Sequence, residues 1–310
     1  MEAATARMKI LLTGATGLVG RDLAFAAVEG GFELLSVKHT YPPERGKPVL
    51  LDMSSSDSVR KAFEANRPEV VIHAAAMTDV DACESNKDLA LAINAKATEA
   101  IAIEAKRTGS HVVYVSTDYV FDGSKGSYDE NDEPNPVNFY GESKLMGEVA
   151  VERFAPTWCI ARTSTPYGLH PRRKSFPVVV AERLSACEEM KVVSDQRTSP
   201  THTANLSMMI LELAARRSEG TVHVSSSTGI SRLEFAARVA KELELDGSLL
   251  RPARGEEVGW RAVRPRDTTL NVSKANSLLA AKPESLEESL RAFIPSLKRQ
   301  EMHARTRTDK

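Results

Sequence analysis

A tyrosine and a lysine lie four positions apart in the segment YGESK, residues 140–144, where a proline-containing loop becomes a predicted helix. Four positions are about one helical turn, so Tyr140 and Lys144 share a face. A phenol can protonate the alkoxide that forms when hydride reaches a ketone, and a nearby ammonium favours that exchange. Thr117, at the carboxyl end of a predicted strand, can donate to the carbonyl oxygen. Each residue alone could be a surface or turn residue, but together they indicate carbonyl reduction.

A glycine-rich segment precedes these residues in the chain. Gly14, Gly17 and Gly20 follow the apolar run 8–12 and open a predicted helix. Gly14 suits a tight turn, Gly17 lets a pyrophosphate approach backbone N–H groups, and Gly20 lets the helix lie close to the sheet. The spacing is Gly-x-x-Gly-x-x-Gly rather than the commoner Gly-x-Gly-x-x-Gly. It predicts a dinucleotide-binding loop with cofactor contacts at Gly14, Thr16, Gly17, Leu18, Val19 and Gly20.

The end of the second predicted strand bears on which dinucleotide would bind. An NAD-preferring site has a carboxylate there for the adenosine ribose, whereas this chain has Lys38 and His39. A cation favours a 2′-phosphate, so we expect NADPH, with NADH as the alternative if Lys38 is only a solvated strand end. Asp52 and Met53 follow the third strand and are expected at the adenine. Asp52 could instead cap the helix that comes next.

The elements around these residues alternate between short apolar runs and helices. Helices are predicted near 56–66, 86–107 and 141–153, between strands that show no polar alternation. That pattern indicates an α/β fold, a Rossmann-type doubly wound parallel sheet covered on both faces. The expected division is a dinucleotide-binding domain at 8–165, a smaller, mainly helical substrate-binding lobe at 166–296 whose strands can cross back to the first domain, and a disordered basic tail at 297–310.

Composition excludes several classes of partner. The 310 residues include 41 basic and 42 acidic side chains, so no bulk charge favours nucleic acid or an anionic membrane. No apolar run approaches a membrane span or a signal-peptide core, and we expect a cytoplasmic protein. The scattered Cys83, Cys159 and Cys187 predict neither a disulfide framework nor a zinc site, and no metal is expected. A monomer or a homodimer is equally compatible with the two long helices near 86–107 and 141–153.

Longer stretches resemble the extended short-chain dehydrogenase/reductase superfamily, and within it the dTDP-4-dehydrorhamnose reductase family. They cover nearly the whole chain from residue 8 to about 295, and STDYVFDG and DQ…SPT are the most specific. The matching segments are TGATGLVG at 13–20, HAAAMTDVDACE at 73–84, VSTDYVFDG at 115–123, NFYGESKLMGE at 138–148, RTSTPYG at 162–168, VVSDQRTSPT at 192–201 and RPRDTTLNVSKA at 264–275.

The resemblance implies NAD(P)H-dependent reduction of the C4 keto group of a nucleotide-activated 4-keto-6-deoxy sugar. Tyr140 would be the proton donor, Lys144 its partner and Thr117 the ligand of the carbonyl. The family pattern also places Ala74, Ala75, Ala76 and Thr78 against the cofactor. Residues expected to contact the sugar nucleotide are Thr117, Asp118 and Tyr119, with Arg197 and Arg264 near its diphosphate or, alternatively, in ion pairs at the surface or between the lobes.

One position departs from the family pattern. A large aromatic usually follows RTS in the bacterial members, and here that position is Thr165. The resemblance then implies a different 4-ketosugar, or a pocket whose sugar platform comes from elsewhere in the chain.

Two other functions remain open at this point. Epimerisation or 4,6-dehydration could use the same scaffold, but dehydratases carry an acidic residue after the Thr-Asp pair, where this chain has Tyr119. That argues against dehydration and only weakly against epimerisation. A non-catalytic NADP-binding regulator, similar to the β subunit of methionine adenosyltransferase, is the other alternative. The presence of Thr117, Tyr140 and Lys144 tells against it without excluding it.

Overall fold

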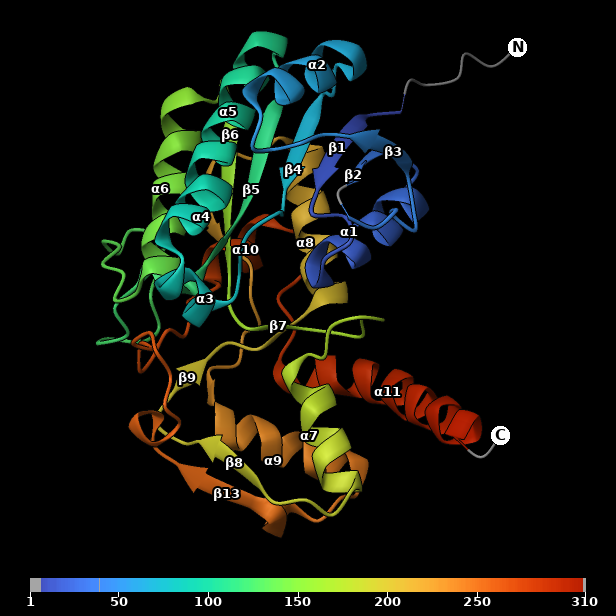
Figure 1. The fold of residues 1–310 in the computed structure, drawn as a ribbon, viewed down its shortest axis with the longest axis vertical. Helices are drawn as coiled ribbons and strands as arrows, with labels where there is room; N and C mark the ends of the chain where they lie inside the picture. The colour runs from blue at the N-terminus through green and yellow to red at the C-terminus, as the bar shows by residue number, and fades with distance from the viewer. Residues whose placement is uncertain (1–6, 39, 309–310) are drawn as a thin grey trace.

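The protein is built around a seven-stranded sheet in which every strand is parallel to its neighbours (Figure 1). The structure, a computed structural model, describes residues 7–38 and 40–308. The strand order β11-β6-β5-β4-β1-β2-β3 confirms the predicted doubly wound α/β sheet. These strands are β1 Lys9–Thr13, β2 Glu33–Lys38, β3 Lys47–Leu50, β4 Val70–His73, β5 His111–Thr117, β6 Trp158–Thr163 and β11 Gly220–His223.

Helices cover both faces of the sheet, because alternate residues of a strand point to opposite faces. Ile10 and Leu12 pack in the core on the side of α1 and α8, whereas Leu11 packs with α2, α5 and α6. All three side chains are fully buried, and burial of each contributes roughly 1.5–3 kcal/mol. The winding reverses between β1 and β4, which leaves a crevice at the carboxyl ends of the strands.

The helices agree with the predicted ranges and add short ones that the sequence did not reveal. None that lies within 7–38 and 40–308 is both long enough and apolar enough to cross a bilayer. Their bounds are α1 Leu18–Glu29, α2 Ser56–Asn66, α3 Val80–Ser85, α4 Lys87–Leu91, a π-helix η1 Ala92–Lys96, α5 Ala97–Thr108, a 3₁₀ turn η2 Asp118–Val120, α6 Phe139–Phe154, α7 Phe176–Ser185, α8 Thr203–Arg216, α9 Arg232–Leu243, 3₁₀ turns η3 Gly247–Leu249 and η4 Gly255–Glu257, α10 Ser273–Leu278 and α11 Leu286–Thr308.

A second hydrophobic core lies below the sheet in Figure 1, among α7, α9 and α11. Tyr167 is at its centre, with ring centroids 5.3 Å from both Phe235 and Phe293. We propose that this core is the substrate lobe and that the division falls near residue 165, with β11 and α8 returning to the first domain. The lobe also holds the short pairs β7 Pro166–Tyr167 with β10 Thr201–His202, β9 Arg197–Thr198 with β12 Ile230–Ser231, and β8 Met190–Val193 with β13 Leu250–Ala253.

The C-terminal segment differs from its prediction. Residues 297–310 are expected to be disordered, but α11 continues through Thr308. Leu290, Phe293 and Leu297 are each at most 2% exposed and line one side of this helix in the second core. Their spacing of three and four residues is that of a helical face, so tertiary packing extends the helix past Pro295.

Candidate active site

The glycine loop, residues 14–20, lies in close contact with the residues that follow β4 and leads into α1. Gly14 has φ +71°, and a Cβ there would lie 2.8 Å from the Ala74 carbonyl carbon and the Ala75 nitrogen. A Cβ on Gly20 would lie 2.0 Å from the Gly14 oxygen, and Gly17 N–H donates to that same oxygen at 2.8 Å. Gly17 precedes α1 and, within residues 7–38 and 40–308, no side chain caps this helix start, which leaves its first N–H groups available to an anion. Thr16, Leu18 and Val19 surround this helix start.

A chain of buried hydrogen bonds holds the segment after β4 against the glycine loop. Ala75 N–H donates to Thr13 Oγ1 at 3.2 Å, Thr13 lies 2.6 Å from His73 Nδ1, and His73 Nε2 lies 3.0 Å from Thr98 Oγ1. Thr98 Oγ1 uses its only proton to donate to the Asn94 carbonyl. It must therefore accept from His73 Nε2, so the imidazole carries its proton on Nε2. Burial and the charge of Lys144 lower the pKa of His73 to about 3, which keeps the imidazole neutral. The residues predicted to contact the cofactor come after His73 in the chain and are Ala74, Ala75, Ala76 and Thr78.

Asn94 is a site residue that sequence reasoning missed. Its Oδ1 accepts from Met77 N at 2.8 Å, and its Nδ2 donates to Met77 O at 3.1 Å and to Ser143 Oγ at 2.9 Å. It is fully buried within the π-helix η1, a local irregularity often found at functional sites. Asn94 therefore ties the loop after β4 to the helix that carries Tyr140 and Lys144. An asparagine at an inward position of an apolar helix face is the only sequence signal for it.

Tyr140 and Lys144 lie on the first turns of α6, which Asn138 caps by accepting from Gly141 N at 3.0 Å. Lys144 is 2% exposed, donates to Val115 O at 2.8 Å, and its Nζ lies 3.9 Å from the Tyr114 ring centroid. Burial lowers the pKa of Lys144 to about 7, and the Glu148 carboxylate opposes that shift.

The Tyr140 phenol meets the end of β5. Burial raises the pKa of Tyr140 above its ordinary value, and a hydrogen bond with the Thr117 side chain counters this. Lys144 reaches the same strand through Val115, two residues before Thr117. The structure therefore brings together the three residues whose types and order predict carbonyl reduction.

A buried ion pair lies one turn beyond Lys144. Arg162 donates to both Glu148 oxygens, at 3.0 Å from Nε and 2.7 Å from Nη2, and Ser116 Oγ donates to Oε1 at 2.5 Å. The Glu148 and Arg162 side chains are 2% and 6% exposed. These bonds join α6, β5 and β6 directly behind the catalytic candidates.

The Asp118 carboxylate is buried among hydroxyl donors. Its carboxylate accepts from Thr117 at 3.1 Å, from Ser164 at 2.7 Å and from Thr268 at 2.5 Å, and the residue is 2% exposed. Burial outweighs these hydroxyl donors and raises its pKa to about 6. Asp118 therefore links three segments of the chain through its carboxylate, and its predicted contact with the substrate stays a prediction.

Tyr119 remains at the site, next to the proposed proton donor. Its ring centroid lies 5.8 Å from that of Tyr140 in an edge-on arrangement, and its hydroxyl accepts from Gln196 Nε2 at 2.9 Å.

The two predicted arginines have separate surroundings. Arg197 pairs with Glu234 at 3.7 Å and Asp267 at 3.4 Å while 46% exposed, so the ion-pair alternative describes it. Arg264 is 13% exposed, and it pairs with Asp81 at 3.1 Å. A third arginine, which the sequence did not single out, interacts electrostatically with Arg264.

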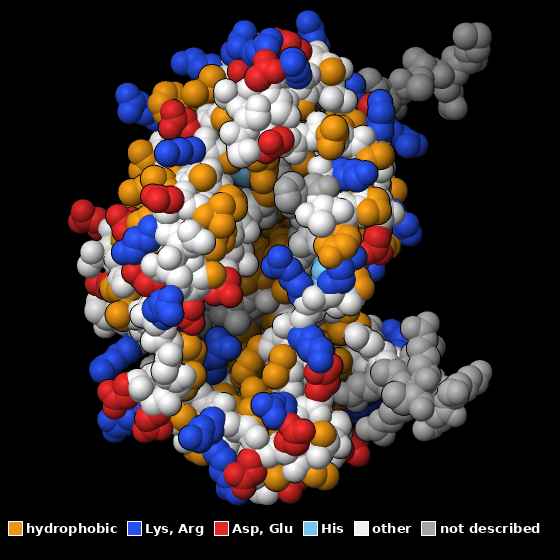
Figure 2. Space-filling view, viewed as in Figure 1, with side chains coloured by type: hydrophobic (Ala, Val, Ile, Leu, Met, Phe, Trp, Pro, Cys, Tyr) orange, Lys and Arg blue, Asp and Glu red, His pale blue; other side chains and the backbone are white. Residues whose placement is uncertain are grey.

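Arg232 opens α9, and its guanidinium lies 4.7 Å from the Phe176 ring centroid. Burial lowers the pKa of Arg232, Tyr119 raises it and the charge of Arg264 lowers it further, so Arg232 lies within electrostatic reach of both residues. Within the described chain, Arg232 has no carboxylate partner in the structure. Figure 2 shows a hollow between the upper and lower parts of this face, with Lys and Arg side chains along its border.

The adenosine-side candidates lie at the ends of β2 and β3. Lys38 is the exposed last residue of β2, and His39 lies outside the described residues. Asp52 Oδ1 accepts from Ser54 N at 2.9 Å and from Ser54 Oγ at 2.6 Å, which shapes the turn before α2. Met53 packs against the core on that face. None of these positions, as described, tests the cofactor contacts predicted for them.

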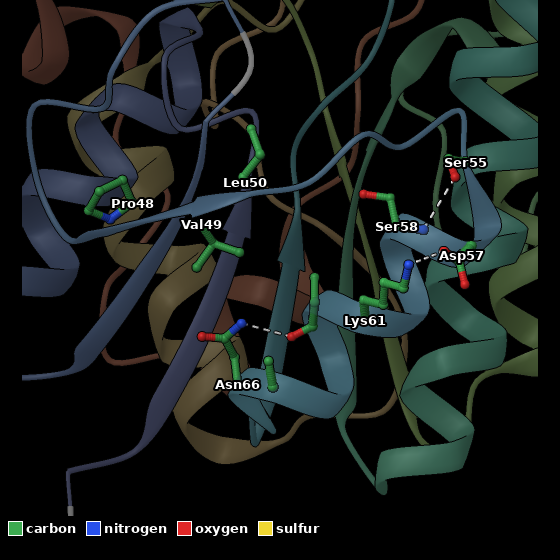
Figure 3. A pocket seen from close by; sticks show the side chains of 10 residues that line it. Pro48, Val49, Leu50, Ser55, Asp57, Ser58, Lys61 and Asn66 are labelled. Carbon is green, nitrogen blue, oxygen red and sulfur yellow. Dashed lines mark hydrogen bonds and ion pairs between the residues drawn. The ribbon is translucent and has the colours of Figure 1, made fainter.

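A separate surface hollow lies between the edge strand β3 and α2 (Figure 3). Its volume is about 510 Å³. Its lining includes Pro48, Leu50, Lys61 and Asn66, and none of the catalytic candidates, so it is not part of this site.

Comparison with known proteins finds similarity along nearly the whole chain. The family model described as RmlD substrate binding domain matches residues 8–299. The probable low-salt glycan biosynthesis reductase Agl14 of Haloferax volcanii is 32% identical over 291 residues, 92% of this chain and 97% of the relative. The methionine adenosyltransferase 2 subunit beta of Danio rerio is 31% identical over 286 residues, 89% of this chain and 87% of the relative. The crystal structure of dTDP-4-dehydrorhamnose reductase from Bacillus anthracis in complex with NADP has a TM-score of 0.84 at 33% identity, and the match covers 94% of this chain and 99% of that one.

Proposed function

Because this chain belongs to the RmlD substrate binding domain family, we propose that it reduces the C4 keto group of a nucleotide-activated 4-keto-6-deoxy sugar with NADPH or NADH. The observation that carries the proposal is the convergence of Thr117, Tyr140 and Lys144 at the carboxyl end of β5. The free N–H groups at the start of α1 fit the pyrophosphate of a dinucleotide. Its nicotinamide, when bound, supplies the hydride.

The protein's own groups handle the proton and the developing charge. As C4 gains hydride, its oxygen takes the phenolic proton of Tyr140, and the C=O bond becomes CH–OH. The Lys144 ammonium, one helical turn away, stabilises the resulting phenolate. The Thr117 hydroxyl, which donates to Asp118 at 3.1 Å in this structure, would turn its proton to the substrate carbonyl oxygen and orient that oxygen toward the phenol. Solvent then returns a proton to Tyr140.

Two arginines support a substrate that carries phosphate. The charge of Arg264 lowers the pKa of Arg232, and Arg232 has no carboxylate partner among the described residues, whereas Arg264 pairs with Asp81. Two neighbouring guanidiniums repel unless an anion lies between them, and a diphosphate matches their hydrogen-bonding geometry. We therefore assign the diphosphate contact to Arg232 with Arg264, in place of Arg197.

The sugar platform expected after RTS is missing at Thr165. This β-branched residue has φ +41°, and its carbonyl accepts from Thr201 N at 3.2 Å. Tyr119 supplies an aromatic surface next to the Tyr140 phenol instead. A sugar ring that packs on Tyr119 would place C4 at the Tyr140 phenol although position 165 lacks the usual aromatic side chain.

The test measures oxidation of NADPH and NADH by the wild type and Tyr140→Phe with dTDP-4-keto-6-deoxy sugars. Losing the general acid should cost the rate roughly 10²–10⁴-fold, while dinucleotide affinity stays within about twofold. Product analysis separates reduction from epimerisation, because an epimerase consumes no net NADPH. Turnover that survives Tyr140→Phe undiminished would sink the assignment of the proton donor.

One similarity favours a second function, that of a non-catalytic regulatory subunit. The chain is 31% identical to a methionine adenosyltransferase 2 subunit beta over 89% of its length. Dinucleotide binding without turnover of any ketosugar nucleotide, together with co-elution of a methionine adenosyltransferase catalytic subunit, would support this function over the reductase.

A further inference from the structure

The segment HPRRK, residues 170–174, reaches from the second lobe to the glycine loop. It connects β7 to α7, and His170 is 7% exposed. His170 Nε2 lies 3.0 Å from the Thr16 carbonyl oxygen, and Arg172 N–H donates to His170 Nδ1 at 3.2 Å. A carbonyl only accepts and a backbone N–H only donates, so a neutral imidazole with its proton on Nε2 satisfies both bonds. His170 thereby fixes the basic segment against the loop that is expected to bind the dinucleotide.

The next basic residue extends this bridge toward the adenosine end. The Arg172 guanidinium lies 4.1 Å from the Tyr41 ring centroid, a distance typical of cation–π contact. Tyr41 lies three positions after Lys38, at the end of β2, where the adenosine ribose is expected. Arg172 thus spans from the glycine loop to the β2–β3 connection. Burial lowers the pKa of His170, the hydrogen bond with the Thr16 backbone opposes that shift, and the charges of Arg172, Arg173 and Arg21 lower the pKa further, so three cations act on this one imidazole.

The positive charge of this group is only partly compensated. Arg21 donates to both oxygens of Glu44, at 2.8 and 2.9 Å, which satisfies that carboxylate. Lys174 pairs with Glu182 at 2.7 Å. Among the described residues, neither Arg172 nor Arg173 forms an ion pair, although the charge of Arg172 lowers the pKa of Glu44, and both arginines are exposed. Two guanidiniums beside a glycine loop, whose nearby carboxylate Glu44 is already bonded to Arg21, favour a ligand with a phosphate group.

We propose that His170, Arg172 and Arg173 close the adenosine end of the dinucleotide site from the second lobe, with Arg172 and Arg173 binding the 2′-phosphate that distinguishes NADPH from NADH. The inference rests on the proposed function only in that the chain binds a nicotinamide dinucleotide. Arg173 is the adjacent second donor, and Tyr41 holds the Arg172 side chain in place. Lys38 completes a site whose cations come from both lobes.

The experiment compares the dissociation constants of NADPH and NADH for three proteins at one fixed ionic strength. These are the wild type, the double variant Arg172→Ala/Arg173→Ala, and Lys174→Ala. A charge-assisted contact is worth about one order of magnitude in affinity, so the double variant should bind NADPH roughly tenfold or more weakly. Its affinity for NADH should change less than about twofold. Lys174→Ala removes an equally basic side chain that already has an acidic partner, and it should leave both affinities unchanged.

The selectivity between the two dinucleotides decides the outcome. Equal weakening of both would place the arginines at the shared pyrophosphate and overturn the assignment, as would no change for either. An unaltered unfolding midpoint of the ligand-free double variant, together with partial recovery in Arg172→Lys/Arg173→Lys, supports a direct charge contact. A wild type that bound neither dinucleotide would overturn this inference and the cofactor of the proposed function together. If the double variant loses affinity for NADPH alone and the wild type reduces no sugar, this inference is supported and the proposed reductase function is contradicted.

Discussion

Replacing Glu148 with glutamine would test the buried ion pair behind the catalytic candidates. Glu148 accepts two bonds from Arg162 and one from Ser116, and both charged side chains are at most 6% exposed. Glu148→Gln would leave the Arg162 charge buried without a partner, and one of its nitrogens, Nη1, already has no hydrogen-bond partner in the structure. Removing one member of a buried pair costs about 3–5 kcal/mol of unfolding free energy.

The assay is urea denaturation followed by circular dichroism, with two comparison variants. Glu287→Gln breaks an ion pair with Arg291 whose side chains are 71% and 75% exposed, and it should leave the transition almost unmoved. The double variant Glu148→Gln/Arg162→Met removes the orphaned charge and should recover much of the lost stability. A loss for Glu148→Gln no larger than for Glu287→Gln would refute the reasoning.

The same substitution should also alter the pH profile of the proposed reduction. Glu148 raises the pKa of Lys144 against the effect of burial, so without that carboxylate the pKa falls below its value of about 7. The ammonium would then lose its proton at a lower pH, and the alkaline fall in rate should move in the same direction. An unshifted profile would mean that Glu148 acts on structure alone.

Two further predictions concern the loop and the buried titratable groups. Gly20→Ala would put a Cβ 2.0 Å from the Gly14 oxygen, so dinucleotide affinity measured by calorimetry should fall at least roughly tenfold, and unchanged affinity would contradict the packing. His73 and His223 have pKa values of about 3, below 6.5 in the unfolded chain, so their contribution to stability is present above pH 6.5 and is lost as pH falls toward 3. Asp118, with its pKa raised to about 6, opposes them partly between pH 6 and 4, because the folded state binds its proton more tightly. Unfolding midpoints should therefore decline between pH 7 and 4, and a flat or rising series would contradict these burial effects.

The small strands and short helices show where sequence patterns lose their information. The strands of the main sheet are apolar runs of four to seven residues, long enough to stand out against neighbouring helices. The pairs β7–β10 and β9–β12 have strands of two residues each, and no periodicity can be read from two positions. The disorder predicted for the basic tail, residues 297–310, differs from the observed helix for a related reason. Charged residues dominate its composition, while the single Leu297 that anchors it is recognisable only against the second core.

The sequence by itself determined those features that depend on residues close together along the chain. The glycine spacing, the Tyr140–Lys144 pair and the apolar runs are local patterns, and they sufficed to predict the sheet, the loop at the start of α1 and the candidates for proton transfer. Only the tertiary structure decided which distant side chains meet them. Asn94 bonds to Ser143 across 49 positions, the Asp118 carboxylate accepts from Ser164 and Thr268, and Arg232 interacts electrostatically with Tyr119 and Arg264. Contacts between residues so far apart depend on how the helices and strands pack, and residue spacing along the chain carries no record of that packing.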